Sequence, residues 1–284
     1  MWASPGIVTR VASAGWPACG RSRHISRHRR AAEGHTHFTG AMAGDRNWGV
    51  RSATEDEDDA VSSLFAPHPA WFDDLLTGVG QAFEVTGAET PGWSDPHPDR
   101  NPSEAEYSRC LDPAKYQILQ ARIDAWVEVL VSRGIATSDT VSPTAWTGAV
   151  RGPDALRRVR RLAPVRAGSV GVVFGETVVG GEPFGVDVGV FDPSDASQVL
   201  LDTIPDCGCD ACDSGSDDLL AVLDGWILSV ARGGVVHARS ASSYVSRTID
   251  GWQAAGDERA LETWLDEDVT VPPGVRRWVG EPWA

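Results

Sequence analysis

The sequence predicts an α+β protein in which an antiparallel sheet carries helices packed on one face, with a disordered N-terminal tail before it. Apolar residues recur at helical spacing in three segments, and short runs rich in β-branched residues fill positions 141–204 between glycines and prolines. The links between those runs are too short for helical crossovers, which favours antiparallel pairing. A chain of 284 residues, 42% of them hydrophobic, can bury a substantial core.

The N-terminal part differs from the rest in charge and complexity. We expect residues 1–61 to form a disordered Arg/His-rich extension and an acidic linker, and residues 62–284 to form a single α+β domain. Up to residue 41 the extension holds six arginines and one acid, and the linker contains the acidic run Glu55–Asp59. Met1 and Met42 are alternative starts.

The first helix is predicted at about residues 69–85. Pro69 precedes a set of apolar residues at helical spacing. These residues are Trp71, Phe72, Leu75, Leu76, Val79 and Phe83. Repeated proline between Pro91 and Pro102 then predicts a loop, because proline prevents regular structure.

A second helix is predicted between Asp112 and Gly134. Asp112 can serve as the N-cap, Pro113 suits the first turn, and Gly134 supplies the stop. Its apolar face consists of Tyr116, Leu119, Ile123, Trp126, Val127 and Leu130. We expect this helix to pack against the first one or to share a sheet with it.

Five strands are predicted in the region that follows, because its β-branched runs are bounded by glycine and proline. The candidates are residues 144–150, 159–164, 169–174, 185–191 and 198–204.

A third helix is predicted at about residues 216–231, with Ser214 or Ser216 as its cap and two glycines after it. Two strands, at residues 235–239 and 244–249, and a short helix at about 256–265 complete the expected elements. The C-terminal segment is expected to dock through its tryptophans.

The most concentrated chemistry lies between the last of the five strands and the third helix. The segment Asp206–Asp213 reads DCGCDACD and holds three of the five cysteines, Cys207, Cys209 and Cys212. The two-residue spacing between Cys209 and Cys212 is that of a zinc knuckle, in which a tight turn directs two thiolates at one ion. A second Cys/His pair at a distance is missing from the sequence.

The fourth ligand of such a site has several candidates. His237 lies on the strand after the third helix, Asp210 and Asp213 lie within the cluster, and a water molecule is a further alternative. The two remaining cysteines are interpreted differently. Cys110 is expected to be a small buried apolar residue, and Cys19 lies in the extension.

Three interpretations of the cluster stay open: a metal site, unligated thiols in a strand-to-helix turn, and redox or catalytic thiols. The surrounding carboxylates disfavour thiolate and are expected to raise the cysteine pKa, whereas the helix N-terminus acts in the opposite direction. A disulfide across the single residue Gly208 would be strained.

Two further charged motifs are interpreted as surface features. The motif Asp95–Asp99 places His97 between two carboxylates, and we expect a rigid loop there. Four arginines, Arg157, Arg158, Arg160 and Arg161, are expected on a solvated strand face or edge, where charge discourages aggregation. The less favoured interpretations are a metal or proton-transfer role for the first motif and an anionic partner for the second.

Charge and missing motifs limit the function. Of 25 basic and 40 acidic residues, the extension takes six and one, which leaves 19 and 39 for the remainder. We therefore expect no nucleic-acid partner and, without a long apolar segment, no membrane partner. Lys115 is the only lysine, which we attribute to the codon bias of a GC-rich genome. The odd cysteine count, without an export signal, favours the cytoplasm.

No phosphate-binding loop, dinucleotide fingerprint, HExxH or G-x-S-x-G motif occurs. The leading hypothesis is a non-catalytic binding or interaction protein, with a protein partner, in which zinc is held at the cysteine turn. The alternative is a thiol-redox or metal-dependent enzyme that uses the same cysteines.

The segment PDCGCDACDSGSDDLLAVLDGWILSVARGG resembles a mostly actinobacterial family of uncharacterised proteins, classed as a domain of unknown function. The stretches from Pro69 to Arg109 and PGVRRWVGEPW are similar to the beginning and the end of that family. The resemblance therefore covers about residue 65 to the C-terminus. It implies no activity, and no catalytic residue is carried over.

Overall fold

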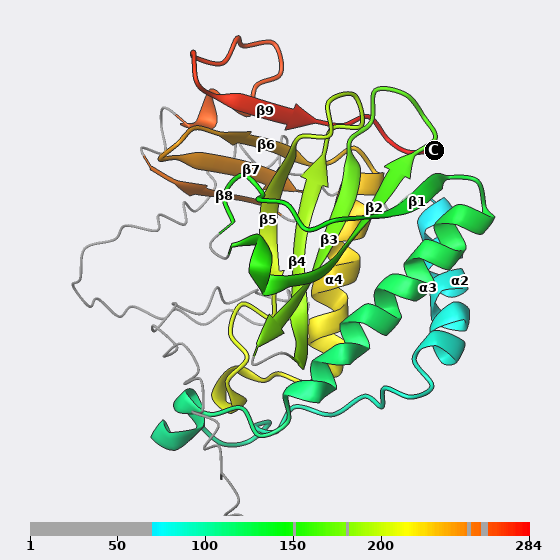
Figure 1. Cartoon of the computed structure of the whole chain (residues 1–284), viewed down its shortest axis with the longest axis vertical. Helices are drawn as coiled ribbons and strands as arrows, with labels where there is room; N and C mark the ends of the chain where they lie inside the picture. The colour runs from blue at the N-terminus through cyan, green and yellow to red at the C-terminus, as the bar shows by residue number, and fades with distance from the viewer. Residues whose placement is uncertain (1–69, 150–151, 180–181, 249–250, 257–260) are drawn as a thin grey trace, which may run out of the picture.

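The computed structural model describes residues 70–149, 152–179, 182–248, 251–256 and 261–284. The predicted extension and linker of residues 1–61, and the start of the predicted domain at residue 62, lie outside these residues. Within the described residues the α+β class is confirmed (Figure 1). None of the helices described combines the length and the apolar character needed to cross a membrane.

The main sheet has five strands in the order of the chain, and each neighbouring pair is antiparallel, as predicted. Its central strands are buried on both faces, which explains their continuous β-branched runs. The strands are β1 (Ala136–Val141), β2 (Leu156–Pro164), β3 (Gly171–Val179), β4 (Glu182–Phe191) and β5 (Gln198–Ile204).

Three helices pack on one face of this sheet, also as predicted (Figure 1). Apolar residues at helical spacing predicted a helix in each of these three segments, and α4 has the predicted bounds. They are α2 (Ala70–Thr86), α3 (Ile118–Ser132) and α4 (Ser216–Ala231). The main core lies between the helices and the sheet, and the indole of Trp126 is completely buried in it.

The start of the second predicted helix differs from the expectation. Residues Pro113–Gln117 form the 3₁₀ helix η2 before α3 begins, and the Asp112 side chain makes no capping hydrogen bond. Gly134 ends the helix as predicted, because its φ of 68° is a left-handed conformation that favours glycine. Across it, Ile135 N–H donates to Leu130 O at 3.0 Å.

Of the strand predicted at residues 144–150, the described residues 144–149 do not form a strand. In this segment Thr147 makes only an isolated bridge to Val199, while Trp146 packs on the sheet face opposite the helices with Val159, Val173 and Phe191. The apolar character of the segment therefore reflects this small second core and not a place in the sheet.

A second, four-stranded antiparallel sheet was not predicted as a separate sheet. Its order is β8-β7-β6-β9, and it lies beyond β5 (Figure 1). Its strands are β6 (Val236–Arg239), β7 (Tyr244–Thr248), β8 (Gly251–Ala255) and β9 (Arg276–Val279). As predicted, the C-terminal segment docks through tryptophans, since Trp278 and Trp283 are buried. The helix predicted at 256–265 falls partly on residues 257–260, outside the described part.

Candidate metal centre

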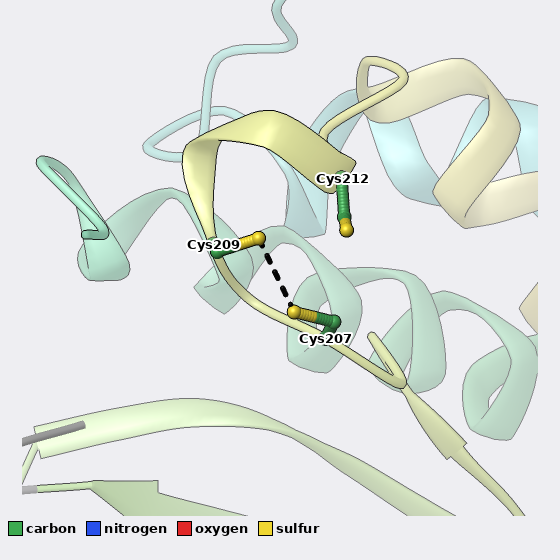
Figure 2. Close-up of side chains that lie close together, drawn as sticks. All are labelled: Cys207, Cys209 and Cys212. Carbon is green, nitrogen blue, oxygen red and sulfur yellow. Dashed lines mark hydrogen bonds between the residues drawn. The ribbon is translucent and has the colours of Figure 1, made fainter. Parts of the chain in front are cut away.

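The three clustered cysteines lie on the loop that joins β5 to α4. This loop contains the short 3₁₀ helix η4 (Asp210–Cys212). The three sulfur atoms lie within 4.8 Å of one another, and the Cys207 and Cys209 sulfurs are 3.3 Å apart (Figure 2). Cys209 is buried, and Cys207 and Cys212 are half-buried. The structure therefore brings together the three thiols that the spacing singled out as one metal-binding group.

The backbone of the turn is fixed by local packing. Cys212 N–H donates to Cys209 O at 3.1 Å, which closes the turn around the two thiols. Gly208 packs against the buried Phe184 ring, and a Cβ at this position would lie 1.8 Å from Phe184 Cζ. Glycine is therefore required between Cys207 and Cys209 for sterics and not for its φ.

Asp210 holds the turn to a distant segment of the chain. Its N–H donates to Arg109 O at 2.8 Å, and its carboxylate accepts from Arg109 Nε at 2.9 Å and from Leu111 N at 3.0 Å. Residues 109 and 111 are thus both bonded to the residue that follows Cys209. The intervening residue is Cys110.

Asp213 connects the other end of the turn to Lys115 and Trp93. Lys115 Nζ donates to its Oδ2, Trp93 Nε1 donates to its Oδ1 at 2.9 Å, and Gly215 N–H donates to Oδ1 at 2.9 Å. Burial acts to raise the pKa of Asp213, but the hydrogen bonds from Lys115, Trp93 and Gly215 together hold that pKa below its ordinary value.

The Lys115 ammonium also lies 5.2 Å from the ring centroids of both Trp93 and Tyr116. Tyr116 is buried, and its ring makes an edge contact with Phe184, which covers Gly208. Lys115, Trp93 and Tyr116 were not predicted as neighbours of the cluster. The one available signal was that Lys115 is the only lysine of a chain whose other cations are arginines.

The N-terminus of α4 is organised by the same segment. The predicted serine cap is wrong: Gly215, with a φ of 93°, occupies the N-cap and no side chain caps the helix. The Ser216 hydroxyl accepts from Trp93 N–H at 3.0 Å and donates to Trp93 O at 3.1 Å. The loop around Trp93 is therefore attached to α4 directly beside the cysteine turn.

The residues predicted as possible fourth ligands lie outside the group of three sulfur atoms. None of His237, Asp210 and Asp213 belongs to the compact group of three thiols. Both carboxylates take part in the hydrogen bonds described above. His237 lies buried on β6 in the second sheet, where Nδ1 is 2.6 Å from Ser246 Oγ and the ring stacks on Tyr244.

His237 makes the stability of the protein sensitive to acid. Burial, with a smaller effect of the Arg239 charge, lowers the pKa of His237 from 6.5 to about 4. The folded state therefore favours the neutral ring. The stability that depends on this neutral ring is fully present above pH 6.5, the ordinary pKa of histidine, and is lost as the pH falls below it. We expect this residue to lower the free energy of unfolding by about 3 kcal/mol between pH 7 and pH 4. Urea titrations of the wild type and His237→Gln measure it.

The control is the difference between the two pH profiles, because all other titrating groups are common to both proteins. The wild type should lose about 3 kcal/mol more than His237→Gln over this range. Equal losses would show that the imidazole is not held neutral by burial.

Side chains of both charged motifs pair with carboxylates of the protein itself. His97 lies against Glu106, with Nε2 at 3.3 Å from Oε1, and Arg100 pairs with the same carboxylate at 2.7 Å. Within the arginine run, Arg158 pairs with Glu176 and Arg160 pairs with Asp124. These pairings give no support to an anion-binding surface on β2.

The comparison with known proteins gives a family without an activity. A protein-family model, described as a family of unknown function (DUF6226), matches residues 79–284. The range includes the cysteine turn and all the segments around it. No curated protein and no solved structure matches the chain.

Proposed function

The chain belongs to DUF6226, a family of unknown function, so family membership gives it no activity. We propose a function from the candidate metal centre alone. In this proposal the chain is a non-catalytic binding or interaction protein whose cysteine turn holds a structural zinc ion. The observation that carries the proposal is the convergence of three thiols from one six-residue stretch within 4.8 Å.

The chemistry of the donor set favours zinc among the common metals. Thiolates are soft ligands that select zinc and exclude magnesium and calcium, which take oxygen ligands. Four-coordinate zinc sites with cysteine ligands are frequently structural, and their metal contributes directly to folding. A turn between a strand and a helix, with two thiols closed by one backbone hydrogen bond, suits this role.

The surroundings favour a structural role over a catalytic one. Three segments of the chain meet at the turn: the loop around Trp93, residues 109–116 and residues 207–216. A metal at this junction would stabilise contacts between parts of the chain that are about one hundred residues apart in sequence. The nearby carboxylates of Asp210 and Asp213 are occupied by cations and N–H groups and are poorly placed to serve as a general base.

Zinc content tests the proposal. The full chain, purified without a tag, is expected to contain one zinc ion per molecule by elemental analysis. Cys209→Ser should lose most of it, because the buried thiol has no substitute in the turn. Cys19→Ser, which changes the cysteine of the N-terminal extension, is the matched control and should keep the full zinc content.

Sub-stoichiometric zinc that Cys209→Ser does not alter would remove the proposal. The other two interpretations of the cluster, unligated thiols in a turn and a thiol-redox enzyme, would then remain. Alkylation of the zinc-free protein against pH discriminates the two, because a redox thiol titrates below the ordinary cysteine value of about 8.5.

The proposed setting is the cytoplasm, where thiols stay reduced. A protein is the proposed partner, because the strongly acidic chain repels nucleic acid and anionic lipid. Both proposals follow from composition and are independent of the zinc measurement.

A further inference from the structure

We infer that Cys110 is the fourth ligand of the cysteine turn, so that the site is a closed Cys₄ centre joining the loop before α3 to the loop after β5. The inference rests on the proposed metal site and assigns its missing ligand. Cys110 stands 97 positions before Cys207, and thus supplies the distant cysteine that a secure zinc site needs.

The backbone places Cys110 beside the turn. Its two neighbours in sequence are both bonded to Asp210, which lies between Cys209 and Cys212: Asp210 N–H donates to Arg109 O, and Leu111 N–H donates to the Asp210 carboxylate. An ion pair between Arg109 and Asp210 strengthens the attachment. This arrangement places the Cys110 backbone beside Asp210, the residue that directly follows Cys209, and none of these bonds involves the Cys110 side chain.

The thiol of Cys110 shares its surroundings with the other cysteines. Burial chiefly raises the pKa of Tyr116, and Asp213 and the thiols of Cys110, Cys207 and Cys209 all add to this increase. The charges of Cys110 and of two cysteines of the turn therefore act on the same buried hydroxyl.

Cys110 is not within 4.8 Å of all three sulfurs, so its side chain has to turn toward them when metal binds. Because residues 109 and 111 are held by Asp210, this adjustment is confined to the Cys110 side chain and its immediate backbone. The other candidates need larger changes. Asp213 would have to leave Lys115 and Trp93, and His237 would have to leave the second sheet.

Four thiolates give a closed tetrahedral centre with no position left for water or substrate. Such a site supports folding and not catalysis. It also explains why a thiol, rather than a plain apolar side chain, occupies the half-buried position 110.

X-ray absorption at the zinc edge tests the inference on the full chain, loaded with zinc and free of excess metal, because it counts sulfur ligands. The wild type is expected to show four sulfurs. Cys110→Ser should show three sulfurs with one oxygen or nitrogen, and its zinc affinity in a chelator competition should fall by at least about tenfold. Cys110→His should show three sulfurs and one nitrogen, with affinity above that of the serine variant. Cys19→Ser should match the wild type.

The outcomes separate this inference from the proposed function. Zinc bound by three sulfurs in the wild type, with the same count and affinity in Cys110→Ser, overturns the role of Cys110 and leaves the proposed metal site intact. Absence of zinc from the wild type overturns both. If Cys110→Ser does not fold, the wild-type count and the histidine variant still decide the result.

Discussion

Asp224→Ala is expected to destabilise the protein by about 3–5 kcal/mol, because it leaves a buried cation without its partner. Asp224 on α4 accepts two hydrogen bonds from Arg122, at 3.0 and 2.6 Å, and one from Trp126 Nε1 at 2.6 Å. The side chains of Arg122 and Asp224 are only 11% and 15% exposed. The free energy of unfolding from urea titration measures the effect.

The pair of Arg122 and Asp224 makes contacts in α2, α3 and α4. Arg122 also lies 5.2 Å from the Phe83 ring of α2, so its position affects both α2 and α4. Asp217→Ala, an exposed position in the first turn of α4, is the matched control and should cost less than about 1 kcal/mol. A loss below 1 kcal/mol for Asp224→Ala as well would mean that the guanidinium finds water or another acceptor.

The double variant Arg122→Met with Asp224→Leu separates the pair from the packing around it. Apolar residues of similar size frequently replace a buried ion pair at little cost. We therefore expect the double variant to be more stable than Asp224→Ala alone. The Trp126 N–H remains without its acceptor in both proteins, so its contribution cancels in the comparison.

The sequence allowed α4 and β5 to be predicted with their observed bounds, and the reason is physical. In each element the apolar pattern is produced by burial alone, and glycine, serine or proline stands directly outside it. The strand β1 was missed, since four of its six residues are exposed at the sheet edge and leave no alternation to recognise. Residues 144–149 show the opposite case, in which apolar residues pack on the sheet while only Thr147 makes a bridge to it.

The candidate site was predicted in part for a similar reason. Cys207, Cys209 and Cys212 lie in one stretch, so their spacing alone indicated a common site. Cys110, Lys115 and Trp93 come from a segment about one hundred residues earlier, and only the folded chain brings them to the turn. The attribution of the single lysine to codon bias overlooked its position in a buried ion pair.

Lys115→Met is expected to cost about 3–5 kcal/mol of folding free energy, because the Asp213 carboxylate then stays buried without a cation. The two side chains are only 15% and 6% exposed. Trp93 and Gly215 continue to donate to Asp213, so the loss should come mainly from the missing charge. Urea titration at pH 7 measures it.

Two controls distinguish the buried charge from a general effect of removing a cation. Arg276→Met breaks an ion pair with Asp195 whose side chains are 42% and 48% exposed, and it should cost at most about 1 kcal/mol. Adding Asp213→Asn to Lys115→Met should recover part of the loss, because the neutral amide no longer needs a counter-charge. If Lys115→Met behaved like Arg276→Met, the ammonium would not stabilise the turn. The cysteine loop would then be held by the Trp93 hydrogen bond to Asp213, by the bonds of Asp210 and by packing.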